Sequence, residues 1–456
     1  MNHAHRKPSR RDNIVTVAMS AVFFLCGATA WVFKMKGEGD DLESGLLPFS
    51  PLQVLLPLLG VCSVAIFLLN GRGSLPTPML RVGPSYGFQI GVGLICLGAG
   101  LHLGSSDYGR QALFFIGRWL MPIMYFYFFL LARRSGVPWR PLLYGLVAGA
   151  VISVIAVELA RAGLPLPVRR PTSGGGARFG GFLSHPNQYG ILVSTTAPII
   201  VFLFRSRNIF EKLIGACMVP LYLLALFQSL SKANIIFFFL SLAACSLLLA
   251  VGNPKKLVAT LIGLAVLATG MVAGGAVGLE MMYRLSPRNA AYVEEAIFNT
   301  GDSRAMVSRE EIWGDAIDHI RKNPLFGLGP GRTHDELLNN HAHNLFLQMW
   351  LDAGVAGELG VLLVVGSVFW RAGQIIRPAL RRRGAPSEEE IMQRLSGVAI
   401  VTYVIANSVS DSFSTATMPV FVLFAGFAFC MKPEQRQPAP GPVEDEAKRA
   451  IPISPE

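Results

Sequence analysis

Charged residues are scarce in this chain of 456 residues. Asp, Glu, Lys and Arg make up only 15% of it, whereas hydrophobic residues make up 52% and the mean hydropathy is +0.46. Soluble globular proteins carry about 25% charged residues, most of them on their surface. The composition therefore excludes an ordinary soluble domain and indicates a membrane protein.

Cysteine in loops is lacking as well. All 6 cysteines fall inside long apolar runs, so the sequence suggests neither a disulfide framework nor a thiolate metal cluster. The net charge of +11 does not indicate nucleic-acid binding, because the basic residues form short clusters between apolar runs. The sequence also contains no internal repeat, so repeat architectures are excluded.

Long apolar runs are what the chain does contain. They continue over about 20 residues, the length that crosses a bilayer, and they lack the two-residue alternation of barrel strands. We therefore predict an all-α polytopic membrane protein with about twelve transmembrane helices. The predicted spans are 14–33, 51–69, 83–103, 111–131, 141–160, 187–204, 213–229, 233–250, 257–279, 343–370, 395–412 and 415–431.

The basic clusters between these spans predict the orientation. Lys and Arg gather in the N-terminal segment and at every second connection, and such clusters stay in the cytoplasm. Both termini are therefore predicted to be cytoplasmic, with one transmembrane domain over 1–431 and a disordered tail over 432–456. The first run could instead be a signal peptide, because Ala28-Thr29-Ala30 resembles a cleavage site.

Basic residues also occur in three connections on the external side. Among them are Arg178, Lys232, Arg288, Arg304 and Arg309. Long external segments tolerate basic residues, and simple tolerance is one interpretation. The other is an anion site, since a lipid diphosphate held at the outer leaflet would need several Arg or Lys donors.

The longest of these connections, 280–342, lies between the ninth and tenth predicted spans and has helical periodicity from Ser303 onward. One face of the predicted helix contains Ile312, Trp313, Ala316, Ile317 and Ile320, and the residues away from it include Glu310, Glu311, Asp315 and Asp318. Asn323-Pro324 ends the helix. We predict an amphipathic helix that lies on the membrane over the spans and forms a lid.

Histidine occurs where the tenth span emerges on the external side. His343 opens that span, and an imidazole with a pKa near neutrality is suited to accept a proton from a hydroxyl group. His341 ranks second, because it would share the same face only in an extended segment. The histidines His185, His319 and His334 could complete a metal site, but no His pair has i,i+4 spacing, so we predict no metal.

Further polar and small residues accompany these candidates. Asn187 and Asn344 stand at predicted helix starts, where Asn caps free N–H groups. Asp411 is an intramembrane acid that either pairs with an arginine of the site or lies at the interface. We interpret four glycines as positions of close packing or tight turns, namely Gly180, Gly181, Gly354 and Gly357.

Three motifs follow one another in the second half of the chain. The first is Arg178-Phe179-Gly180-Gly181-Phe182 followed by His185-Pro186-Asn187-Gln188-Tyr189-Gly190. The second combines Ser308-Arg309 and Trp313 with Asn323-Pro324-Leu325-Phe326-Gly327-Leu328-Gly329, and the third is His343-Asn344-Leu345-Phe346-Leu347-Gln348. In this order and spacing they resemble the bacterial O-antigen ligase and polymerase family. Many relatives have a Ser-Arg pair where this chain has Ser231-Lys232, so Lys232 ranks below Arg178 and Arg309.

The resemblance implies a membrane glycosyltransferase of the bacterial inner membrane with a periplasmic active site. Its donor would be a glycan linked to undecaprenyl diphosphate, and the resemblance implies no cofactor. His343 would act as the base or as a donor to the diphosphate, and the basic residues named above would bind that diphosphate. The acceptor would be the lipid A core in a ligase, which we favour, or a growing polysaccharide in a polymerase.

Two other classes of function stay open. A secondary transporter of an anionic solute would have broken helices and charged groups near the middle of the membrane, whereas the predicted spans are largely free of charge. A scaffold subunit of a polysaccharide export complex would tolerate the loss of His343.

Overall fold

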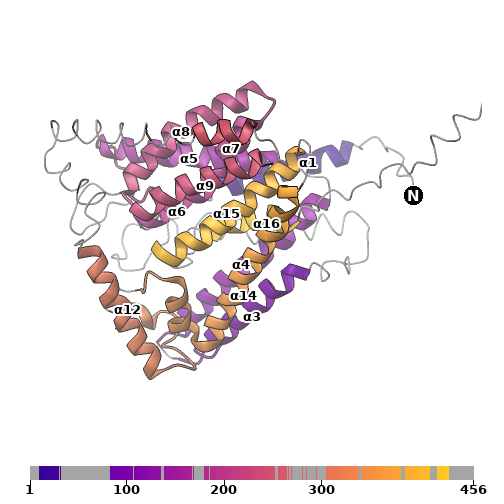
Figure 1. Cartoon of the computed structure of the whole chain (residues 1–456). Helices are drawn as coiled ribbons and strands as arrows, with labels where there is room; N and C mark the ends of the chain where they lie inside the picture. Colours follow the sequence, from indigo (N-terminus) through magenta and orange to yellow (C-terminus); the bar gives the residue numbers. More distant parts are fainter. Residues whose placement is uncertain are drawn as a thin grey trace, which may run out of the picture.

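The computed structural model describes residues 10–29, 31, 83–105, 107–134, 138–166, 168, 179–183, 185–251, 255–263, 265, 269, 280, 284, 294, 304–337, 341–381, 386–410 and 418–430. Within these ranges the regular elements are helices and no strand occurs, which confirms the all-α prediction (Figure 1). The first helices are α1 (Arg10–Thr29), α3 (Gly83–Gly100), α4 (Gly109–Arg134), α5 (Arg140–Arg161), α6 (Pro186–Thr196), α7 (Pro198–Arg205), α8 (Ile209–Ser229) and α9 (Lys232–Ala250). The later ones are α12 (Arg304–Lys322), α13 (Arg332–Glu336), α14 (Leu345–Arg381), α15 (Glu388–Ser410) and α16 (Met418–Cys430).

The helices follow the predicted spans closely. Each predicted span within the described ranges coincides with one helix, or with the consecutive pair α6 and α7, while 51–69 lies outside these ranges and 257–279 is described only in part. Among the described residues, five helical segments are long and apolar enough to cross a membrane, namely Arg140–Arg161, Pro186–Arg205, Ile209–Ser229, Lys232–Ala250 and Leu345–Pro378. The count of about twelve spans remains a prediction.

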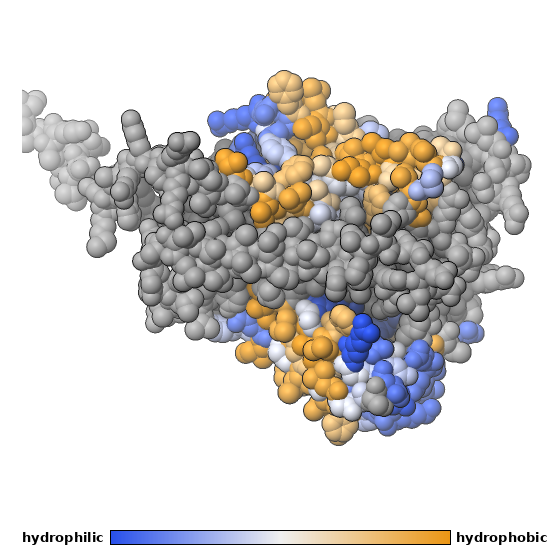
Figure 2. All heavy atoms as spheres, turned by 180° about the vertical axis from the view of Figure 1, so that it is seen from behind, coloured by the Kyte–Doolittle hydropathy of each residue, from blue (hydrophilic) through white to orange (hydrophobic). Residues whose placement is uncertain are grey.

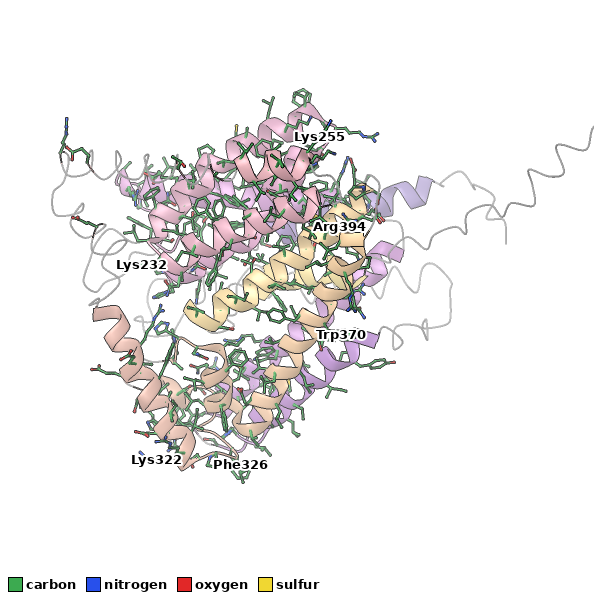
Figure 3. All side chains as sticks on the ribbon, viewed as in Figure 1. Lys232, Lys255, Lys322, Phe326, Trp370 and Arg394 are labelled. Atoms are coloured by element: carbon green, nitrogen blue, oxygen red, sulfur yellow. The ribbon has the colours of Figure 1, made fainter. Side chains whose placement is uncertain are left out.

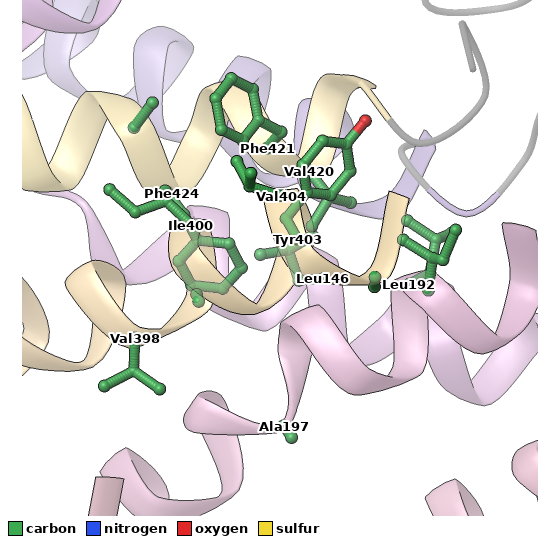
Figure 4. Packing of buried hydrophobic residues seen from close by; sticks show 14 of the residues in the cluster. Leu146, Leu192, Ala197, Val398, Ile400, Tyr403, Val404, Val420, Phe421 and Phe424 are labelled. Carbon is green, nitrogen blue, oxygen red and sulfur yellow. The ribbon is translucent and has the colours of Figure 1, made fainter. Parts of the chain in front are cut away.

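The hydrophobic core is shared by most of the helices, among them α3, α5, α6, α14, α15 and α16. Figure 4 shows Tyr403 of α15 beside Phe421 of α16, and their rings stack with centroids 4.8 Å apart. Trp139, next to α5, contacts Phe427 edge to face at 5.6 Å. Large apolar side chains also remain on the outer helix faces, where Figure 2 shows hydrophobic patches. Such faces suit helices that contact lipid.

Polar contacts join helix ends at two places, while the alternation of sides stays a prediction. At the end predicted to be cytoplasmic, Arg140 of α5 pairs with Glu388 of α15 at 2.6 Å. At the other end, the connection between α3 and α4 reaches the segment after α12: His102 Nε2 lies 2.9 Å from the Phe326 carbonyl oxygen, and the Tyr108 hydroxyl donates to Asp335 at 2.9 Å. The predicted external connections therefore meet at one end of the bundle.

Helix α12 is amphipathic, as predicted. Its buried residues Ala316 and Ile320 pack with four apolar residues of the following chain, namely Leu328, Leu337, Ala342 and Leu351. Ile312, on the same face, is also buried. The apolar face therefore packs on other segments of the protein. The assignment of Ile317 to this face is wrong, because its side chain is 39% exposed. At about 100° per residue it lies outside the stripe that Ile312, Ala316 and Ile320 form.

Helix α14 is broken near its start. Ala353 and Gly354 have non-helical backbone angles, with φ +62° at Gly354. The Asn323–Gly329 motif fills the break: the N–H groups of Leu328 and Gly329 donate to the Leu351 carbonyl at 2.7 and 3.1 Å. The Val355 N–H donates in turn to the Leu325 carbonyl at 3.2 Å. These bonds replace the backbone bonds that the break removes from the helix.

The interpretation of the four glycines as tight turns or close contacts is confirmed. Gly181 also has a positive φ, +62°, and a Cβ atom at Gly180 would lie 2.9 Å from the Leu183 carbonyl oxygen. A Cβ at Gly357 would lie 2.5 Å from the Met349 carbonyl oxygen.

Candidate active site

The segment before α14 brings two histidines together. The rings of His341 and His343 lie edge to face, with centroids 3.8 Å apart and planes at 67°. His343 has a left-handed backbone conformation with φ +48°, which only a few per cent of residues other than Gly adopt, although His is among the more frequent of them. Both side chains are half-buried. The backbone therefore turns sharply to bring these two rings into contact.

Asn344, the next residue, caps α14 as expected. Its Oδ1 accepts hydrogen bonds from the N–H groups of Phe346 at 3.0 Å and Leu347 at 3.2 Å. The cap fixes the point where the His segment ends and the helix begins. His343 therefore lies immediately before the positive end of a helix.

A third histidine joins the pair. The ring of His185 lies 6.2 Å from that of His343, centroid to centroid, although the two residues come from different motifs. His185 is also the N-cap of α6, because its Nδ1 accepts a hydrogen bond from the Asn187 N–H at 3.1 Å. The prediction that Asn187 caps this helix is therefore wrong: Asn187 already lies inside it. Since the N–H is the donor, neutral His185 carries its own proton on Nε2.

The sequence did not single out His185 as a site residue. Its signal was the position directly before Pro186, because proline favours the first turn of a helix and the residue before it is extended. That pattern marks His185 as a cap. Its approach to His343 depends on the packing of segments far apart in the chain.

Arg309 lies on α12, the helix that is hydrogen-bonded to the His segment. One turn after it on α12, Trp313 donates its Nε1–H to the Ala342 carbonyl at 2.9 Å, between His341 and His343. Arg309 is half-buried, and this burial lowers the pKa of its guanidinium. It makes no hydrogen bond or ion pair with the described part of the chain. A half-buried cation of this kind favours an anionic partner.

Lys232 is a second basic residue of the predicted site, and it comes from a helix other than α12. It begins α9, after a left-handed residue at Leu230 (φ +46°), and in Figure 3 it lies at the end of α9 that faces α12. Asn234, in the first turn of α9, is fully buried and donates to the Asn187 carbonyl of α6 at 3.2 Å. This bond joins the start of α9 to the start of α6, where His185 lies. The ends of α6, α9 and α14 at this site are all N-termini, which attract anions.

For the other predicted site residues, the structure describes only the backbone or nothing. Arg304 is the first residue of α12, but its side chain lies outside the description. Arg178, Arg288 and Asp411 lie outside the described residues. Phe179, after Arg178, is fixed by its N–H, which donates to the Gln228 carbonyl at 2.7 Å. Among the residues that the structure describes, no three His, Cys, Asp or Glu side chains are grouped to hold a metal ion.

A comparison with protein families finds a match in the middle of the chain. Residues 217–362 match the family model described as O-Antigen ligase. The resemblance to the O-antigen ligase and polymerase family is confirmed. The match supports a membrane glycosyltransferase of the O-antigen ligase family, and its range includes Lys232, Arg309, His341 and His343. No curated protein matches the chain. His185 precedes the matched range. The site therefore combines residues of the matched segment with the start of α6, which lies before it.

Proposed function

We propose that this protein transfers a glycan from undecaprenyl diphosphate to an acceptor hydroxyl at the periplasmic face of the bacterial inner membrane. We propose O-antigen ligation, with the lipid A core as acceptor. One observation carries the proposal: the helix that holds the half-buried Arg309 is bonded through Trp313 to the peptide beside His343. A positive group for a diphosphate and a group that can accept a proton are therefore linked in one site.

The diphosphate is the leaving group in this proposal. Its charge increases as the bond to the anomeric carbon breaks, and Arg309 and Lys232 stabilise that charge together with the N-termini of α6, α9 and α14. By sequence, Arg178, Arg288 and Arg304 are further ligands. Asn344 caps α14, Asn187 joins α6 to α9 through its carbonyl group, and Asp411 would neutralise one arginine. The positive groups supply the stabilisation that other glycosyltransferases obtain from a divalent metal.

His343 is the proposed base. It takes the proton of the acceptor hydroxyl while that oxygen forms a bond to the anomeric carbon, and the carbon–oxygen bond to the diphosphate breaks with its electron pair going to the diphosphate. The reaction is one displacement with inversion and needs no ATP. His341 packs against His343 and keeps its ring in place. His185 offers its Nε2–H as a donor to the sugar or the diphosphate.

The test is turnover by the purified protein in proteoliposomes with a lipid-diphosphate glycan. Release of lipid diphosphate only when lipid A core is added supports the ligase. A ladder of longer glycans without core identifies a polymerase, which would use the same residues. If the protein turns over no donor with either acceptor, and the anionic glycan instead crosses the membrane unchanged, the enzyme proposal fails in favour of a transporter.

A further inference from the structure

The two peptide groups that flank Ala342, between the histidines, are each held by a side chain. Trp313 of α12 donates to the Ala342 carbonyl oxygen, in the peptide that leads to His343, at 2.9 Å. The Ala342 N–H, in the peptide that follows His341, donates to Gln348 Oε1 of α14, also at 2.9 Å. Ala342 itself is fully buried. The two bonds fix the backbone of Ala342, because loss of either partner leaves a buried polar group unsatisfied.

The orientation of the Gln348 amide is itself set by its neighbours. Gln348 Nε2 donates to both carboxylate oxygens of Asp352, each at 3.0 Å, and the Thr333 hydroxyl donates to Asp352 at 2.8 Å. An ionised carboxylate only accepts hydrogen bonds, so the amide must turn its N–H groups toward Asp352 and its oxygen toward Ala342. Gln348 and Asp352 are both about 5% exposed, and this low exposure strengthens the bonds.

His343, which follows Ala342, needs the support of these two hydrogen bonds. His343 adopts φ +48°, a conformation that costs free energy for an ordinary side chain and persists only where the surroundings impose it. The backbone of Ala342 determines where the His343 backbone begins. Trp313 fixes the peptide between Ala342 and His343, and Gln348 fixes the peptide between His341 and Ala342, from two different helices, one of which contains Arg309.

We propose that Trp313 and Gln348 are positioning residues, which hold His343 in its left-handed conformation and tie it to the helix of Arg309, with Asp352 orienting Gln348. The inference deepens the proposed function, since it assumes that His343 and Arg309 act in one site. The two residues touch neither donor nor acceptor. They act through the backbone of Ala342.

The experiment compares variants that change one hydrogen bond at a time in the full-length protein. Trp313→Phe keeps an aromatic ring but removes the donor. Its matched control is Trp350→Phe, because Trp350 makes the same kind of bond, to the Pro324 carbonyl at 2.8 Å. Gln348→Glu removes the N–H groups that face Asp352 and places two carboxylates together. Adding Asp352→Asn restores a donor to that pair, so the double variant is expected to rescue Gln348→Glu.

Two measurements are made on each variant. The first is kcat and KM for the lipid-diphosphate donor. The second is the rate at which diethyl pyrocarbonate modifies His343, followed by mass spectrometry with His319 as the internal reference, and it requires no substrate. We expect Trp313→Phe and Gln348→Glu to lower kcat and change the His343 modification rate by about five- to tenfold each, the effect of one lost hydrogen bond. KM, the His319 rate and the Trp350→Phe values stay near those of the natural protein.

The outcomes separate the two proposals. Equal losses in Trp313→Phe and Trp350→Phe, or no rescue by the double variant, overturn the positioning role. A His343 modification rate that no variant changes overturns it as well. If the natural protein turns over no donor but the modification rates change as expected, the positioning of His343 stands and the proposed function fails.

Discussion

The rings of His341 and His343 lie edge to face, 3.8 Å apart between centroids, across a single intervening residue. In an extended strand, side chains two positions apart point to the same face, but their Cβ atoms are more widely spaced than this contact allows. The left-handed backbone of His343 closes that spacing. Backbone strain of this kind is concentrated at functional sites.

His343→Asn is expected to reduce turnover by about 100- to 10,000-fold, the contribution of a positioned acid or base. Asparagine tolerates the left-handed conformation, so the backbone should be preserved while the base is lost. The rate is measured in proteoliposomes, with thermal unfolding to check the fold. His319→Gln is the control, because His319 contacts Asp315 and Glu336 away from the pair. Retained activity in His343→Asn would refute the assignment of the base.

His341→Ala should have a smaller effect, about tenfold on kcat, because the ring supports His343 without accepting the proton itself. The measurement is the same initial rate at saturating donor. If His341→Ala were as damaging as His343→Asn while the protein stayed folded, the proton acceptor would have to be reassigned to His341.

Arg309→Met is expected to weaken donor binding and to stabilise the protein. Burial lowers the pKa of Arg309, and no described group pairs with it, so its charge opposes folding until the diphosphate arrives. We expect KM for the donor to rise by at least about tenfold and the unfolding temperature by about 2 °C. The control is Arg321→Met, since Arg321 is an exposed residue of the same helix that already pairs with Asp318. A lower unfolding temperature in Arg309→Met would show that the charge has a partner in the folded protein.

Features that depend on local sequence patterns, such as helices and their caps, could be predicted from the sequence. Contacts between distant segments could not. Apolar runs located the helices, and Asn344 was predicted as a cap because capping needs only the next few residues. His185 was not expected in the site, because its approach to His343 joins two motifs through tertiary packing. The bond from Trp313 to Ala342 was missed for the same reason.

Chelation is expected to leave activity unchanged. Three histidines meet in the site, but His185 Nδ1 is occupied by the Asn187 N–H, and we propose that positive side chains and helix ends replace a metal. Turnover is measured after dialysis against EDTA and again after adding Mg²⁺ or Zn²⁺. Activity that is lost on chelation and restored by one ion would require a metal in the mechanism.

Gly354→Ala should be far more damaging than Gly366→Ala in the same helix. Gly354 has φ +62°, and a Cβ there would lie 2.1 Å from the Leu325 carbonyl oxygen, whereas a Cβ at Gly366 meets nothing within 4 Å. The first variant must therefore expel the Asn323–Gly329 motif from the break in α14, which also disturbs the packing of α12. We expect a loss of at least about 3 kcal/mol in Gly354→Ala, and a change within about 1 kcal/mol in Gly366→Ala, where alanine favours the helix. Both are measured by thermal unfolding in detergent. Equal stability of the two variants would mean that the break in α14 is not part of the folded protein.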